Sequence, residues 1–105
     1  MSRQVRCKGA RMRIEGEMTV YTAAALHTQV SEVLVKRPSI NLLDLSEVTE
    51  IDTAGLQVLL VARRSAEALG RQLQIVAGSP SVNDVLDLLQ LTQWVKPTAA
   101  AETKP

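Results

Sequence analysis

The side chains best suited to chemistry lie in one acidic segment near the middle of the chain. Residues 38–62 contain no lysine or arginine and hold Asp44, Glu47, Glu50 and Asp52, with Thr53 directly after them. Such carboxylates could bind a metal ion or accept a phosphoryl group, and the hydroxyl could itself be phosphorylated. The chain lacks an adjacent acidic pair after its first strand. We therefore predict no catalytic residue, no metal site and no cofactor.

Other reactive side chains do not change that prediction. His27 is the only histidine and lies on a predicted helix, and Cys7 has no activating partner nearby in the sequence. The glycines form no phosphate-binding pattern, so nucleotide binding is unsupported. We expect a non-enzymatic protein.

Length and composition limit the remaining possibilities. The 105 residues carry 12 Lys+Arg against 11 Asp+Glu, which allows one domain and argues against nucleic-acid or anionic-membrane partners. A single cysteine forms no internal bridge, and no apolar run approaches the ~20 residues of a membrane span. We expect a cytoplasmic protein without membrane insertion, with a core of Leu, Val, Ile and Ala because Phe is absent.

Thr53 is predicted to lie at the start of a helix. Asp52 is a good N-cap, and Thr53 then takes the first helical position with its hydroxyl near the surface. Gly55 costs ~1 kcal/mol in a helix, which indicates either close backbone approach or room for a partner. The residues from Leu56 and Val58 to Ala62 are apolar around the whole axis. Either this half of the helix is buried all round, or part of it is an exposed docking patch.

Periodicity predicts the elements around this helix start. Alternation on either side of Gly16 predicts a hairpin of residues 11–15 and 17–21, and a period of three to four predicts a helix over 22–36. A strand over 40–45, a turn over 46–51 and a helix over 53–69, closed by Gly70, follow.

The last predicted elements are a strand over 73–77, a helix capped by Ser79 or Ser81, and a short strand at Trp94 and Val95. Strands alternating with helices indicate parallel crossovers, and the hairpin makes the sheet mixed. The predicted fold class is α/β, a mixed and mostly parallel sheet of four to five strands flanked by helices. We expect a flexible basic arm over residues 1–10, a domain over 11–96 and a disordered tail over 97–105.

The central motif resembles the signature of the STAS domain family, the anti-sigma-factor antagonists and their relatives. It consists of Asp44-Leu45-Ser46 followed by Ile51-Asp52-Thr53-Ala54-Gly55-Leu56, and Gly16-Glu17-Met18-Thr19 is similar to a "GELD" segment upstream. The resemblance covers about residues 11–95. It implies a phosphorylatable residue at the position of Thr53, where many antagonists have Ser, and kinase engagement beside it at Asp52.

The resemblance implies a binding module with protein partners: an anti-sigma factor or a serine/threonine switch kinase, and a phosphatase. The partner-binding residues are predicted to be Asp44, Asp52, Thr53, Gly55, Leu56 and Val58. The alternative is a constitutive cytoplasmic STAS subunit of an ABC lipid transporter of the lipid-asymmetry type, which docks on the ATPase subunit. The sequence leaves both open.

Overall fold

A computed structural model describes residues 3–91, which form a four-stranded sheet with three helices. The strands are β1 (Val5–Lys8), β2 (Arg11–Met18), β3 (Leu42–Ile51) and β4 (Gln74–Gly78). They lie side by side in that order, with β1 and β2 antiparallel and the other two pairs parallel. The predicted class, a mixed and mostly parallel α/β sheet, is confirmed.

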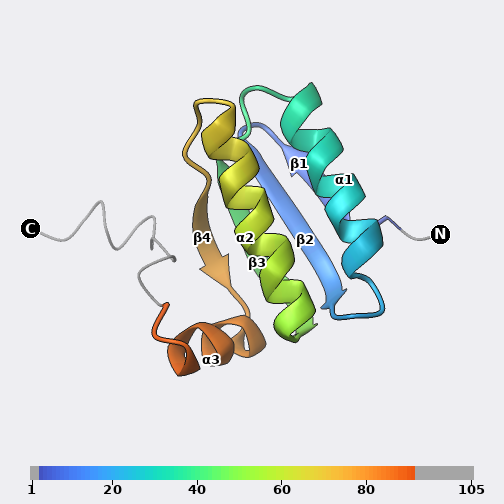
Figure 1. The fold of residues 1–105 in the computed structure, drawn as a ribbon, viewed down its shortest axis with the longest axis vertical. Coiled ribbons are helices and arrows are strands. Elements are labelled where there is room, and N and C mark those ends of the chain that lie inside the picture. Colours follow the sequence, from blue (N-terminus) through green and yellow to red (C-terminus); the bar gives the residue numbers. More distant parts are fainter. Residues whose placement is uncertain (1–2, 92–105) are drawn as a thin grey trace, which may run out of the picture.

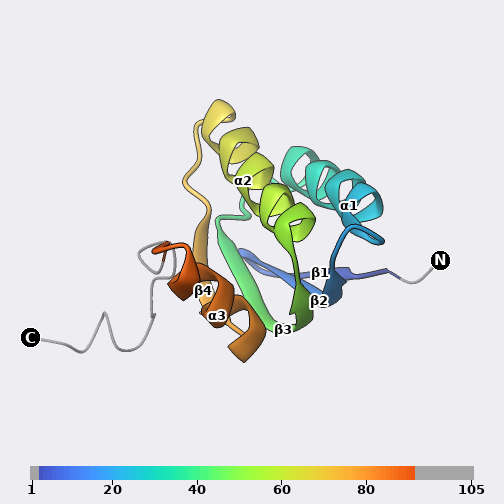
Figure 2. The same cartoon turned by 60° about the horizontal axis from the view of Figure 1, so that its bottom comes forward.

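The helices are α1 (Ala23–Lys36), α2 (Thr53–Ala68) and α3 (Pro80–Leu88). Figures 1 and 2 show α1 and α2 side by side on one face of the sheet, while α3 packs against β3 and β4. The strand β2 ends, and α1 and α2 begin, at the same edge of the molecule (Figure 1). This edge gathers segments that are about thirty residues apart in the sequence.

The core is aliphatic, as the composition predicts. Each helix contributes one apolar stripe with the spacing of three or four residues that places side chains on one face. In α1 the buried side chains are those of Leu26, Val30, Val33 and Leu34. They belong to the same hydrophobic cluster as residues of the strands, among them Met12, Ile14 and Leu43, which are almost completely buried. One hydrophobic cluster therefore joins the sheet with α1 and α2, and it also includes Val82 and Leu86 of α3.

The N-terminal hairpin differs from the prediction. It turns at Gly9 and Ala10, and its first strand is β1. Gly16, predicted as the turn, instead has a φ of +83° within the single strand β2, where the register with β3 shifts. The expected flexible arm was therefore wrong for residues 5–8, because Val5 is fully buried and these residues pair with β2.

The strand β3 is longer than predicted. Residues 46–51, expected to form a turn, continue the strand beside β2, and Ile51 pairs with Met18. Burial of Val48 among exposed acids explains the continuation, since one apolar side chain keeps the segment on the core. The predicted strand at Trp94 and Val95 and the predicted tail over 97–105 lie outside the described residues.

Candidate functional site

Asp52 caps α2, as predicted. Its backbone is extended, and its Oδ1 accepts a hydrogen bond from the amide of Gly55 at 3.1 Å. Its carbonyl accepts the first helical bond, from Leu56 at 2.9 Å. Thr53 is thus the first residue of the helix and is exposed. The helix start presents a hydroxyl to solvent next to a carboxylate.

Asp52 also connects two loops. Its Oδ2 accepts a hydrogen bond from the amide of Val20, 3.0 Å away in the loop between β2 and α1. The hydrogen bonds from Gly55 and Val20 lower the pKa of Asp52 below its ordinary value because they favour the charged carboxylate. One ionised side chain therefore fixes the loop relative to the start of α2.

The loop after β2 is held by its threonines. The hydroxyl of Thr22 donates to the carbonyl of Glu17 at 2.8 Å and accepts from the amide of Thr19 at 3.0 Å. Thr19 is buried, and its hydroxyl accepts from the amide of Tyr21 at 3.3 Å. These bonds leave Val20 65% and Tyr21 90% exposed.

Val20, Tyr21, Asp52 and Thr53 therefore form one exposed surface, here named the α2-start surface. Its apolar half, Val20 and Tyr21, is not predicted by the sequence patterns. The sequence pattern places Tyr21 at the end of a strand, whereas in the structure Tyr21 lies in the loop directly before Thr22, the N-cap of α1. Large apolar side chains exposed beside polar groups are typical of docking surfaces.

Gly55 owes its place to close backbone approach. A Cβ on Gly55 would lie 1.9 Å from the carbonyl oxygen of Met18 at the end of β2. The same oxygen accepts a hydrogen bond from the amide of Asp52 at 3.1 Å. Of the two explanations offered by the sequence, close approach is confirmed. Gly55 is buried, so its prediction as a partner contact was wrong.

The apolar residues at the front of α2 do not form a surface patch. Leu56 is 8% and Val58 5% exposed, and both belong to the core. The helix lies against α1 on one side and against β2 and β3 below, which covers Leu56, Val58, Leu59 and Ala62, while Leu60 and Val61 are half-buried. Leu56 and Val58 were therefore wrongly predicted as docking residues.

Asp44 is also absent from the α2-start surface. Its carboxylate accepts hydrogen bonds from the hydroxyl and amide of Ser46, at 2.6 and 2.9 Å, and lies 3.4 Å from Arg11 and 3.6 Å from Arg13. Burial alone would raise the pKa of Asp44, but the Ser46 hydrogen bonds and the two guanidinium groups outweigh it and lower the pKa. Asp44 precedes Asp52 by eight residues, roughly 26 Å of strand. Its prediction as a partner contact was wrong, because it is 2% exposed.

Among residues 3–91, no three His, Cys, Asp or Glu side chains gather as a metal site would require. No helix in the same part of the chain is long and apolar enough to cross a membrane.

The mixed sheet, its helices and the capped start of α2 define a small α/β domain of the STAS type. The sequence model of the family described as "Mlab, STAS domain" matches residues 2–97, and the chain therefore belongs to the STAS domain family.

Solved structures of anti-sigma-factor antagonists have the same fold. The antagonist from Mycobacterium paratuberculosis is 25% identical, with a TM-score of 0.68 and coverage of 89% of this chain and 82% of that one. A putative antagonist from Thermotoga maritima is 23% identical, with a TM-score of 0.72 and coverage of 93% and 90%. The Bacillus cell fate determinant SpoIIAA in its phosphorylated form is 16% identical, with a TM-score of 0.62 and coverage of 94% and 96%.

Proposed function

We propose that this chain is a non-catalytic regulatory module that binds a protein partner through the α2-start surface, and that phosphorylation of Thr53 switches the binding. The partner is an anti-sigma factor or a serine/threonine switch kinase, and a phosphatase reverses the modification. The observation that carries the proposal is the exposure of Thr53 at the first residue of a capped helix.

The helix start can hold a phosphate without loss of the fold. Phosphorylation adds about −1.5 to −2 charge and three acceptor oxygens. The free amides and dipole at a helix N-terminus favour an anion. The Thr53 side chain makes no hydrogen bond within residues 3–91 that the modification would break. The phosphate should therefore act on binding more than on stability.

Binding is sensitive to a phosphate at this position because the neighbouring groups are already acidic. Asp52 is ionised next to Thr53, and Glu50 is exposed three residues before Thr53. A partner that covers the surface would have to desolvate the added charge beside these carboxylates. A loss of ~1.4 kcal/mol suffices for a tenfold change in affinity. SpoIIAA, which has the same fold, has been solved in a phosphorylated form.

The first test replaces Thr53 with a negative side chain. We expect Thr53→Glu to abolish capture of the partner from cell extract and to leave the melting temperature nearly unchanged. The matched control is Thr28→Glu, which places the same charge on an exposed position of α1. Intact mass measurement of the recovered native protein would show the added phosphate. Normal capture by Thr53→Glu would refute the switch.

The second test concerns the apolar half of the surface. We expect Tyr21→Ala to weaken the complex about tenfold or more, because exposed aromatic residues at the centre of an interface contribute most to affinity. Val35→Ala is the control, since Val35 is 70% exposed on α1 away from this loop. Affinities would be measured by calorimetry with the captured partner. Equal affinities of Tyr21→Ala and Val35→Ala would show that the interface does not include Tyr21.

Two residues favour a second candidate, the constitutive STAS subunit of an ABC lipid transporter. Thr53 stands where many antagonists have Ser, and Thr19 is buried as part of the loop where many have Asp. In this case the α2-start surface docks permanently on the ATPase subunit. The same capture experiment separates the candidates, because an unmodified protein recovered with an ATPase would support the second.

A further inference from the structure

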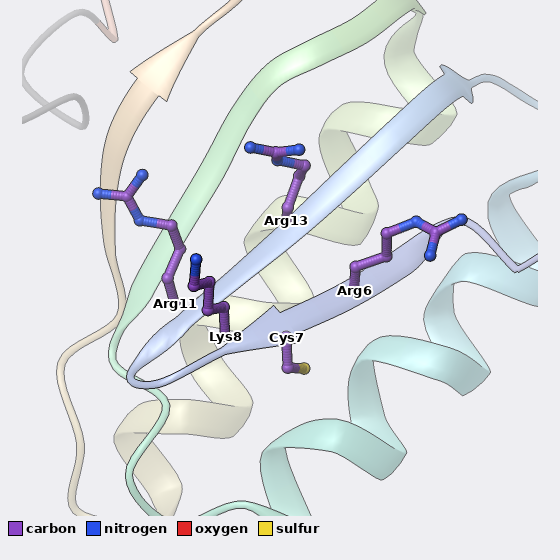
Figure 3. Close-up of a pocket in the computed structure, with 5 residues that line it drawn as sticks. All are labelled: Arg6, Cys7, Lys8, Arg11 and Arg13. Atoms are coloured by element: carbon purple, nitrogen blue, oxygen red, sulfur yellow. The ribbon is translucent and has the colours of Figure 1, made fainter.

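Strands β1 and β2 carry a second unusual surface, on the face turned away from α1 and α2. Figure 3 shows Arg6, Lys8, Arg11 and Arg13 projecting to one side of these strands, while Cys7 points to the other. We name these four residues the basic face. Together with Cys7 they line a groove of about 730 Å³. The alternate residues Val5, Met12 and Ile14 are buried in the core, as the period of two in a strand requires.

The cations of the basic face lie directly opposite one another. In the antiparallel ladder Arg6 pairs with Arg13 and Lys8 pairs with Arg11. Like charges at such cross-strand positions destabilise a sheet. The position of β1 at the edge of the sheet explains the charges on β1, because charges on an edge strand prevent it from pairing with other chains. It does not explain Arg11 and Arg13, since β2 lies inside the sheet between β1 and β3.

Two carboxylates neutralise the basic face only in part. Glu15 lies 3.1 Å from Arg6 and 3.7 Å from Arg13, and Asp44 reaches Arg11 and Arg13. Lys8 makes no ion pair within residues 3–91. Four cations against two carboxylates leave a local charge of +2 on a chain whose total is +1.

Asp44 gives the basic face a fixed geometry. Its carboxylate is 3% exposed and is itself held by Ser46, whereas the Arg11 and Arg13 side chains remain 45% and 43% exposed. A guanidinium group has five N–H donors, and Asp44 engages only one edge of each. Glu15 lies 3.7 Å from a second nitrogen of Arg13, and the other donors of these half-exposed guanidinium groups remain available to an anion. Their pre-organised arrangement lowers the entropic cost of binding that anion.

The arrangement suits discrete carboxylates better than a uniform anionic surface. Glu15 lies among the cations and would repel a membrane or a nucleic-acid backbone, and membrane recognition needs a larger basic cluster than a local charge of +2. The basic face also has no aromatic side chain on which a base could stack. An acidic polypeptide can place its carboxylates between Glu15 and Asp44 and match single guanidinium groups in bidentate fashion.

We propose that the basic face binds an extended acidic segment of a protein partner, at a site separate from the α2-start surface. The basic face uses β1 and the first half of β2, whereas the α2-start surface follows the last residue of β2. The chain thereby has two binding surfaces of opposite charge. The proposal does not depend on phosphorylation of Thr53.

The test uses the full chain and a fluorescein-labelled peptide of alternating Glu and Ser, with fluorescence anisotropy at low ionic strength. We expect Lys8→Glu to weaken binding about fivefold or more, since reversing a charge removes one attraction and adds one repulsion. Lys8 has no ion pair among the described residues, so the variant leaves the bonds of Asp44 intact. The matched control is Arg64→Glu, the same charge reversal at an exposed position of α2, and this variant should bind the peptide as the native protein does.

Amide shifts in a nitrogen-15 NMR titration should be confined to β1 and β2, and Thr53→Glu should bind the peptide normally. If Lys8→Glu and Arg64→Glu weakened binding equally, the attraction would depend on the net charge of the protein alone, and the proposal would be overturned. Equal binding of an alternating Gln and Ser peptide would do the same. Tighter binding of phosphatidylglycerol vesicles or of a DNA duplex than of the acidic peptide would also overturn it, in favour of that class of partner.

Discussion

Asp44 and Asp52 lie on, and just after, the same strand, and the pKa of each is lowered, yet they serve opposite purposes. Asp44 is buried, and its partners are the hydroxyl and amide of Ser46 together with the charged side chains of Arg11 and Arg13. Asp52 is partly exposed, and its partners are the backbone amides of Gly55 and Val20. The first carboxylate organises a basic surface, and the second organises a surface with acidic and apolar groups.

The difference shows how one strand can support two binding surfaces. A carboxylate that bonds to amides leaves nearby side chains free, so Thr53, Val20 and Tyr21 remain available to a partner. A carboxylate that forms ion pairs with arginines has its negative charge neutralised, but it orients the guanidinium groups. Mutations at the two ends of β3 should therefore separate loss of stability from loss of binding.

The largest effect is expected where the backbones touch at the carboxyl end of β3. Gly55→Ala would place a Cβ 1.9 Å from the carbonyl oxygen of Met18, which cannot move without breaking the bond from the Asp52 amide. We expect a loss of about 3 kcal/mol in the free energy of unfolding, as for overpacking against rigid surroundings. Urea denaturation would measure the loss.

Gly9→Asn is the control for Gly55→Ala. Gly9 has a φ of +59° with open space around the position of a Cβ, and Asn adopts this conformation readily. This variant should unfold at nearly the same urea concentration as the native protein. If Gly55→Ala were equally stable, α2 would not be fixed against the end of β2, and the α2-start surface would lack the rigidity that we assign to it.

The next effect is expected at Asp44. Asp44→Ala leaves the amide and hydroxyl of Ser46 and two guanidinium groups without their acceptor, and we expect a loss of about 2 kcal/mol. The folded fraction should still bind the partner of the α2-start surface with native affinity. Urea denaturation and calorimetry would measure the two quantities. Native stability with weakened partner binding would reverse the roles given to the two aspartates.

Much of the fold could be predicted from the sequence, because local signals and tertiary contacts agree there. The cap at Asp52, the start of α2 at Thr53 and the mixed sheet follow from short patterns. The hairpin was misplaced because Gly16 resembles a turn residue, whereas its positive φ serves an irregularity inside β2. A single glycine does not distinguish these two uses.

The site was harder to predict, because exposure depends on neighbours that are distant in the sequence. Leu56 and Val58 are covered by α1 and the sheet, and Asp44 is covered through its contacts with Arg11 and Arg13. No local pattern reports such contacts. The basic residues near the N-terminus were visible in the sequence, but their gathering on one face depends on the register of β1 with β2.

The smallest expected effect is the pH dependence of stability at the two aspartates. In the unfolded chain an aspartate has its ordinary pKa, 3.8, and in the folded protein the pKa of Asp44 and of Asp52 is lower. The unfolded state therefore binds more protons between the two pKa values. Both groups stabilise the fold fully above the unfolded pKa and lose that contribution as the pH falls through the lower folded pKa values.

Thermal unfolding from neutral pH to well below 3.8 should show a smaller acid-dependent loss of stability for Asp44→Asn and for Asp52→Asn than for the native protein. Added salt should shrink the difference for Asp44→Asn more, because arginine charges contribute to its lowered pKa, whereas amide hydrogen bonds dominate at Asp52. Equal salt effects on the two variants would contradict the assignment of charged partners to Asp44 and of uncharged amide partners to Asp52.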